Sequence, residues 1–280
     1  MQKKTFNILF FCLLGIWILL GILFGKYDLD ISRSLHNPNI AFVQYIEKYG
    51  EIPGLLLALW ALVLMNAAMD IKNVVLRVLA YAGNFILAFF AMIYLVILML
   101  HHSLQATNLY FLADIGSVFW ISPALFLLLV MVLLHYHCRD FAFRHKLFSS
   151  ITIYLTLTGF IVVQTLKNIW GRIRFRDLAK DYSNFSPWYI PQQGGGESFP
   201  SGHTLFAWIL LPLFLLCLNK NSLVRFFLIL LSIVWGFTVG LSRMVIGAHY
   251  ASDVLFSTGF CVLFFLILYR YFGFGKEKRS

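Results

Sequence analysis

The sequence predicts an all-α fold, a polytopic integral membrane helix bundle of about eight spans. Of the 280 residues, 60% are hydrophobic and only 12% are charged, which is about half the charged fraction of a soluble domain. Several apolar runs approach or exceed the ~18 residues that mark a spanning helix. The formal charge of +10 is spread over the ends of these runs, so it indicates helix ends at a membrane surface and no nucleic-acid partner.

The spans are defined by length and by polar punctuation, because periodicity says little about a segment that is apolar on all sides. The first run follows Lys3 and Lys4 and lacks the cleavage site of a signal peptide, so it is interpreted as a spanning helix. Between the first two spans, apolar residues from Phe42 to Tyr49 recur at helical spacing, which predicts a short interfacial helix. The predicted spans are Phe6–Phe24, Ile52–Met69, Val74–Leu100, Val118–Leu134, Leu147–Leu166, Thr204–Leu218, Leu223–Leu241 and Asp253–Phe272.

The distribution of positive charge predicts the orientation of the chain. With both termini in the cytoplasm, the inside segments hold thirteen of the twenty-two lysines and arginines, as the positive-inside bias requires. The outside segments hold nine, and five of these stand in one stretch: Lys167, Arg172, Arg174, Arg176 and Lys180. Positive charge does not usually gather on the outer side, so this stretch is the first sign of a functional site.

The cationic stretch follows the fifth predicted span. Arginine has a planar fork that binds phosphate oxygens at two points, and lysine adds a compact charge, so the stretch suits an anion. A set of side chains that anchor the loop at the membrane surface is the alternative for this segment taken alone.

The same loop continues through Gly194–Gly196 to Phe199–His203 and then directly into an apolar helix. Proline and serine are ordinary residues at a helix start, so a capped helix is one interpretation. The functional interpretation is an anion site made by free backbone N–H groups and the helix dipole. Gly202 would allow a phosphate to approach the backbone, and His203 would stand beside it as a proton donor.

A third polar segment, Ser242–Asp253, joins the seventh predicted span to the eighth. His249 and Asp253 are four residues apart and share one face if the segment is helical. A carboxylate beside one ring nitrogen of a histidine leaves the other nitrogen free to attack, whereas a polar patch at a helix start is the alternative. The loops after spans five and seven face the same side, so all three segments can meet there.

At these residues the sequence resembles the type-2 phosphatidic acid phosphatase family, which shares its catalytic core with vanadium-dependent haloperoxidases. Three motifs carry the resemblance, and they cover about residues 167–253 of a chain interpreted as a single domain over residues 1–280. Phe175 stands where the family usually has proline. The matching residues are Lys167 and Arg174, then Pro200, Ser201, Gly202 and His203, then Ser242, Arg243, His249 and Asp253.

The resemblance implies the role of each residue. His249 would attack phosphorus and form a phosphohistidine, Asp253 would orient it, and His203 would protonate the leaving oxygen. The residues implied to bind the phosphoryl group are Lys167, Arg174, Ser201, Gly202 and Arg243. No cofactor and no metal are expected, since the four cysteines have no paired spacing and no carboxylate cluster would hold magnesium. The family core has six spans, so an extra helical pair near the N-terminus is expected here.

The predicted function is a metal-independent lipid phosphate or diphosphate phosphatase at the extracytoplasmic face of a bacterial inner membrane. One alternative is a phosphotransferase that passes the phosphoryl group to another lipid, and another is a non-catalytic lipid-phosphate binding or transport protein. The substrate stays open among undecaprenyl diphosphate, phosphatidic acid and phosphatidylglycerophosphate, which relatives use. The sequence predicts no oligomeric state.

Overall fold

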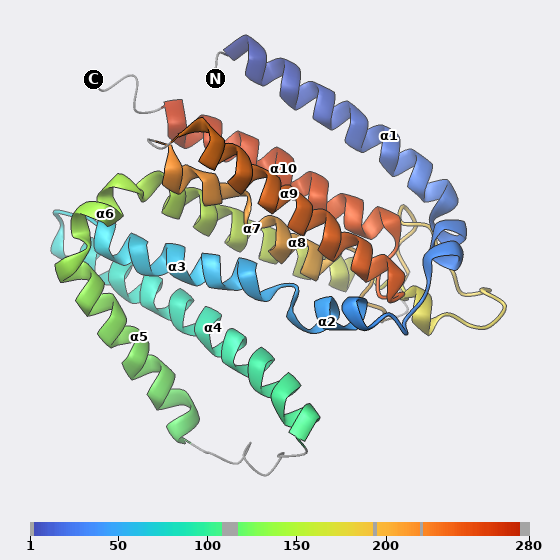
Figure 1. The fold of residues 1–280 in the computed structure, drawn as a ribbon, viewed down its shortest axis with the longest axis horizontal. Coiled ribbons are helices and arrows are strands. Elements are labelled where there is room, and N and C mark those ends of the chain that lie inside the picture. Colours follow the sequence, from blue (N-terminus) through green and yellow to red (C-terminus); the bar gives the residue numbers. More distant parts are fainter. Residues whose placement is uncertain (1–2, 108–116, 193–194, 219–220, 275–280) are drawn as a thin grey trace. The chain divides into compact units, whose positions relative to one another are not determined.

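The computed structural model describes residues 3–107, 117–192, 195–218 and 221–274. Within these ranges the regular structure is helical and contains no strand, which confirms the predicted all-α fold (Figure 1). The α-helices are α1 (Lys3–Leu35), α2 (Ala41–Tyr49), α3 (Ile52–Ala68), α4 (Val74–Thr107), α5 (Ser117–His137), α6 (Arg139–Arg144), α7 (Lys146–Trp170), α8 (Gly202–Trp208), α9 (Ser222–Val245) and α10 (Ala251–Phe274). Two 3-10 helices are η2 (Phe175–Asp177) and η3 (Leu211–Cys217).

The described residues contain six helical segments that are long and apolar enough to cross a membrane. These are Lys4–Leu35, Ala41–Ala68, Val74–Met99, Lys146–Asp177, Ser222–Val245 and Ala251–Gly273. The other two predicted spans correspond to shorter apolar helices, Ile121–His137 and Gly202–Cys217. The second of these is divided, because Pro212 at the start of η3 has no backbone N–H for an α-helical bond and the chain continues as a 3-10 helix. A polytopic bundle is therefore confirmed, although two of the predicted passes are short.

The first helix is longer than the sequence predicts. The apolar run ends at Phe24, but α1 continues for three more turns to Leu35. The extension buries two polar side chains, Asp28 and Ser32, which are 0% and 1% exposed. The short helix expected after it is present as α2, which buries Val43 and Ile46.

The chain divides into two compact units, residues 1–53 with 154–280 and residues 54–153. The unit of residues 54–153 contains α4, α5 and most of α3. Its core is a cluster of buried apolar side chains from these three helices: Leu62, Val63, Ala88, Leu127 and Met131. The buried Asn84 amide donates to the Leu62 carbonyl oxygen at 2.9 Å, so α4 is also tied to α3 by a hydrogen bond.

The other unit holds the sequence motifs. In it α1 runs beside α10, and the Trp17 indole donates to the Leu255 carbonyl oxygen at 3.1 Å (Figure 1). The short helix α8 packs against both α9 and α10, and the Trp208 indole donates to Thr258 Oγ1 at 2.9 Å. The starts of α8 and α10 and the end of α9 are thereby held close together.

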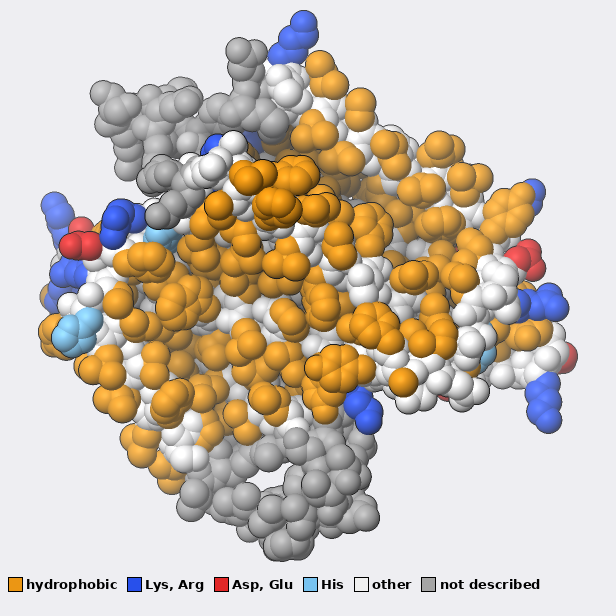
Figure 2. All heavy atoms as spheres, in the orientation of Figure 1, with side chains coloured by type: hydrophobic (Ala, Val, Ile, Leu, Met, Phe, Trp, Pro, Cys, Tyr) orange, Lys and Arg blue, Asp and Glu red, His pale blue; other side chains and the backbone are white. Residues whose placement is uncertain are grey.

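Apolar side chains cover the flanks of the spanning helices, as Figure 2 shows, while most charged side chains lie near helix ends. On α1, for example, Phe11 and Ile22 are about two-thirds exposed. Such exposure of large apolar side chains along whole helices is typical of surfaces that contact lipid. The chain is an integral membrane protein.

Candidate active site

The three polar segments predicted from the sequence meet in the unit of residues 1–53 and 154–280. The loop after α7 reaches the turn between α9 and α10, where the Arg176 backbone N–H donates to the Gly247 carbonyl oxygen at 3.0 Å. The residue before α8 reaches α10, where the Ser201 N–H donates to the Asp253 carbonyl oxygen at 3.3 Å. Segments that are more than 50 residues apart along the chain therefore form one site.

A glycine brings the loop before α8 against the end of α7. The Gly196 N–H donates to the Gly171 carbonyl oxygen at 3.0 Å, and the Ser198 N–H donates to the Arg172 carbonyl oxygen at 2.9 Å. A Cβ at Gly196 would lie 2.7 Å from the Cα of Ile173, so only glycine permits this approach of two backbones. The contact places Ser198 beside the histidine of the third motif.

His249 is buried, with 2% of its surface exposed. Its Nδ1 lies 2.5 Å from the Ser198 carbonyl oxygen and 3.6 Å from Asp253 Oδ2. A carbonyl can only accept, so Nδ1 carries the hydrogen and Nε2 keeps its lone pair. Burial lowers the pKa of His249 to about 4, with Arg243 and Lys167 acting in the same direction and Asp253 in the opposite one. The ring is therefore neutral near pH 7 and chemically able to attack.

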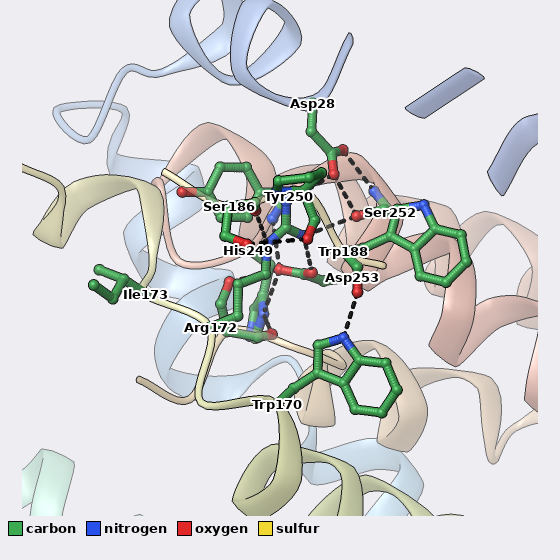
Figure 3. A network of polar contacts seen from close by, with 12 residues as sticks. Asp28, Trp170, Arg172, Ile173, Ser186, Trp188, His249, Tyr250, Ser252 and Asp253 are labelled. Atoms are coloured by element: carbon green, nitrogen blue, oxygen red, sulfur yellow. Dashed lines mark hydrogen bonds and ion pairs between the residues drawn. The ribbon is translucent and has the colours of Figure 1, made fainter. Parts of the chain in front are cut away.

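Asp253 is the centre of the buried polar network in Figure 3. Its Oδ2 accepts from Ser198 Oγ at 2.5 Å and from the Tyr250 N–H at 2.9 Å. Its Oδ1 forms an ion pair with Arg172 at 2.6 Å. The carboxylate thus has a fixed orientation, and it lies beside His249 without being the nearest acceptor of Nδ1.

Arg172 joins the network to the first helix (Figure 3). Its guanidinium forms ion pairs with Asp28 at 2.9 Å and Asp253 at 2.6 Å, and it is 1% exposed. Nε donates to the Ser186 carbonyl oxygen at 3.0 Å, and the Tyr250 ring lies 3.9 Å from the guanidinium carbon. A buried arginine between two carboxylates is charge-compensated, so its role here is to hold Asp253 in place.

Arg243 is the predicted phosphate-binding residue with the most unsatisfied hydrogen-bonding capacity. It is buried, and its Nε and Nη1 have no hydrogen-bond partner in the described part of the protein, while Nη2 lies 3.5 Å from Glu47 Oε1. Arg174 also has a buried Nε without a partner, and its Nη2 lies 3.3 Å from Glu197 Oε2. Together with Lys167, whose charge lowers the pKa of His249, these groups form a cationic cluster suited to an anion.

Ser201 and Gly202 form the start of α8. The Ser201 hydroxyl caps the helix by accepting from the Thr204 N–H at 3.4 Å, and it lies 2.9 Å from Thr204 Oγ1. A Cβ at Gly202 would meet only Val163, at 3.9 Å, so the space in front of this glycine is open. The backbone at the helix start is therefore accessible, whereas the Ser201 side chain is already used in capping.

His203 lies in the first turn of α8 between two glutamates. Nε2 lies 3.1 Å from the Glu47 carbonyl oxygen, and Nδ1 lies 3.9 Å from Glu51 Oε2. Its side chain is 26% exposed, so it is accessible from outside the protein. Loss of solvent lowers its pKa well below the usual value, and the nearby Arg243 and His249 lower it further.

Phe175, which replaces the family's proline, is buried at the start of η2. Its ring lies 5.2 Å from that of His36 and 5.9 Å from that of Tyr182. Aromatic packing of Phe175 thus holds the loop at the position where the family usually has the rigid ring of a proline.

Several site residues were not predicted from the sequence. Glu47, Glu51 and Ser198 contact motif residues, Asp28 contacts Arg172, and Arg172 was noted only as part of the cationic stretch. Asp28 could have been found from the sequence, because an acidic residue in the continuation of an apolar helix is energetically costly unless it has an ion-pair partner. The other contacts are made by backbone carbonyls or by residues distant in the chain. Among the described residues, no three His, Cys, Asp or Glu side chains gather as metal ligands.

Comparison with known proteins gives one family-model match, which covers the three motifs, and two similar proteins. Residues 147–276 match the family model described as the PAP2 superfamily. The chain is similar to phosphatidylglycerophosphatase B of Haemophilus influenzae, with 40% identity over 86 residues, 30% of this chain and 34% of that protein. It is also similar to the lipid A 4'-phosphatase of Bacteroides thetaiotaomicron, with 28% identity over 142 residues, 50% of this chain and 58% of that protein.

Both matches span less than two thirds of the relative's own length. No solved structure is significantly similar to the chain.

Proposed function

We propose, on the premise that residues 147–276 match the PAP2 superfamily as the three motifs predicted, that the chain hydrolyses a phosphate ester or diphosphate of a membrane lipid through a phosphohistidine. The observation that carries the proposal is the state of His249. Its ring is neutral, Nδ1 is bound to the Ser198 carbonyl oxygen, and Nε2 is free to attack. The partnerless N–H groups of Arg243 supply a binding site for phosphoryl oxygens.

In the first step, the lone pair of His249 Nε2 attacks phosphorus and the bond from phosphorus to the lipid oxygen breaks. The leaving oxygen takes a proton from the protonated form of His203, which the negative charge of the bound phosphoryl group favours. The ring of His249 becomes positively charged, and the Asp253 carboxylate 3.6 Å away stabilises that charge. Arg243, with Lys167 and Arg174, stabilises the charge on the phosphoryl oxygens.

In the second step, a water molecule attacks phosphorus of the phosphohistidine. His203, which lost its proton in the first step, accepts a proton from this water, and the bond from Nε2 to phosphorus breaks. Inorganic phosphate leaves, and both histidines return to their initial states. The charge on the phosphoryl group is balanced throughout by side chains of the protein, so the scheme includes no metal.

The two relatives support a lipid headgroup as substrate, since one is named for phosphatidylglycerophosphate and the other for the 4'-phosphate of lipid A. Because the cationic cluster lies at the ends of spanning helices, a lipid phosphate can reach it while its acyl chains stay in the bilayer. The excess of positive charge in the other loops supports a site on the extracytoplasmic side of a bacterial inner membrane, with both termini in the cytoplasm. Residues 1–280 are proposed to act as a single phosphatase domain.

The test is to trap the intermediate. The purified full chain, incubated with a ³²P-labelled lipid monophosphate and quenched rapidly, is expected to carry an acid-labile, base-stable label. The label should be absent from His249→Ala and present in His145→Ala, a matched control in which a histidine outside the site is removed. A label that survives in His249→Ala would place the nucleophile elsewhere.

The same sample distinguishes the alternatives. Hydrolysis releases free phosphate with water alone, whereas a phosphotransferase transfers the label to a second lipid and releases little phosphate. A binding or transport protein gives neither product. A panel of phosphatidic acid, phosphatidylglycerophosphate, lipid A and undecaprenyl diphosphate would identify the preferred substrate by kcat/KM.

A further inference from the structure

The proton donor of the site lies against a part of the chain that is outside the matched family region. Glu47 is in α2, and Glu51 is in the turn between α2 and α3, about 150 residues before His203. The Glu47 carbonyl oxygen faces Nε2 at 3.1 Å, and the Glu51 carboxylate faces Nδ1 at 3.9 Å. The imidazole therefore has a hydrogen-bond acceptor at Nε2 and a carboxylate at ion-pair distance from Nδ1, an arrangement that suits the doubly protonated ring, because only that form carries a positive charge and a hydrogen on both nitrogens.

The position of Glu51 is fixed by close packing of the preceding residue. A Cβ at Gly50 would lie 3.2 Å from Val239 Cγ2, and the Trp235 indole donates to the Gly50 carbonyl oxygen at 3.2 Å. Ile46, one turn earlier, is buried in the same cluster with Val239. Helix α9 thus holds the end of α2, and Glu51 itself is 3% exposed.

The charges around His203 explain why such a carboxylate is needed. Arg243, Lys167 and His249 all disfavour the imidazolium, and so does the loss of solvent, so together they lower the pKa of His203 well below its usual value. A pocket that binds phosphate must be cationic, but a cationic pocket drives the proton off the residue that has to donate it. An anion on the far side of the ring opposes this effect without occupying the phosphate position.

We propose that Glu51 is a positioning residue for catalysis: it orients the His203 ring through Nδ1 and keeps it protonated, so that Nε2 can deliver a proton to the leaving lipid oxygen. The inference rests on the proposed function. Substrate binding must replace the Glu47 carbonyl at Nε2, after which Glu51 remains the partner of the opposite nitrogen. The proton that moves is the one on Nε2, and the Glu51 carboxylate stays beside Nδ1–H as its ion-pair partner throughout.

The test compares Glu51→Gln with the wild-type chain on two substrates. General acid catalysis is typically worth about 10²–10⁴-fold, and a positioning partner supplies part of it, so kcat on a lipid monophosphate should fall about 10- to 100-fold. With para-nitrophenyl phosphate, whose leaving group departs without a proton, the loss should stay below about threefold. Asp30→Asn, the same chemical change at an exposed carboxylate of α1, is the matched control and should leave both rates unchanged.

The pH profile gives a second readout that a purely structural role would not move. Activity on the lipid falls as pH rises through the pKa of His203 in the substrate complex, and loss of the carboxylate lowers that pKa. Glu51→Gln should therefore move the falling limb of kcat to lower pH. In the His203→Ala background, Glu51→Gln should cause no further loss, because it acts through the histidine.

Three results would each overturn the inference. They are an equal loss of kcat on both substrates, an unchanged falling limb of the pH profile of kcat, and a further loss of activity in the His203→Ala background. If Glu51→Gln does not fold, Glu51→Asp keeps the charge but sets it farther from the ring. The loss of kcat in Glu51→Asp should be confined to the lipid substrate, and an equal loss of kcat on both substrates would contradict the inference. Absence of phosphate release by the wild-type chain on every substrate would instead refute the proposed function, so the two failures are distinguishable.

Discussion

The contrast between Arg243→Lys and Arg176→Lys tests which arginine binds the phosphoryl group. Arg243 is buried and has two N–H-bearing nitrogens, Nε and Nη1, without a partner in the described part of the chain. Arg176 has a 35% exposed side chain that forms an ion pair with Glu47 at 2.8 Å. A guanidinium in the position of Arg243 can contact two phosphoryl oxygens, whereas a lysine can replace only one of these contacts.

The magnitude follows from the lost contact. A hydrogen bond to a charged group contributes about 1.5–3 kcal/mol, and about 1.4 kcal/mol corresponds to a factor of ten in rate, so Arg243→Lys should lower kcat/KM about 10- to 100-fold. An exposed ion pair contributes about 0–1 kcal/mol, and lysine can keep it, so Arg176→Lys should stay within about fivefold of wild type. Phosphate release from a lipid monophosphate in detergent measures both. Losses of kcat/KM of the same size in the two variants would refute the assignment of Arg243 as the phosphate-binding arginine.

Four further outcomes are expected. Arg172→Met leaves two buried carboxylates without their cation, so it should destabilise the protein by about 3–5 kcal/mol. The temperature of thermal inactivation should fall, and an unchanged temperature would contradict the role of the network. His203→Ala should lose about 10²-fold or more on a lipid monophosphate and markedly less on para-nitrophenyl phosphate, and equal losses would argue that His203 is not the leaving-group acid. Glu47→Gln removes a carboxylate that competes for Arg243, so inorganic phosphate should inhibit up to about fivefold more strongly; weaker inhibition would show that Glu47 supports binding. Excess chelator should leave turnover unchanged, and activity lost to chelator and restored by a divalent cation would refute the metal-free scheme.

The sequence by itself determined the class of the fold and the family that the motifs resemble. Long apolar runs can only be satisfied in a bilayer as helices, because the backbone has no other hydrogen-bond partners there. The spacing of the motif residues is local information that the sequence displays directly. His249 and Asp253, four residues apart, lie 3.6 Å from each other, although His249 stands in the turn before α10 begins at Ala251 and so shares no helical face with Asp253.

Only the tertiary structure decided how those residues are held. The nearest partner of His249 is the backbone carbonyl of Ser198. Any residue type could supply a backbone carbonyl, so no side-chain pattern in the sequence predicts this contact. Asp28 reaches Arg172 because α1 continues past the end of its apolar run, and a polar extension of a helix is stabilised by the ion pair that it makes.

The surroundings of His203 also could not be predicted from local sequence patterns. Glu51 lies next to it because Gly50 packs against α9, a contact between residues almost 190 positions apart. Close packing of this kind depends on the shapes of two surfaces at once, and no local pattern in the sequence shows which surfaces meet. Local spacing therefore indicated the groups that are proposed to react, and long-range packing decided which groups contact them.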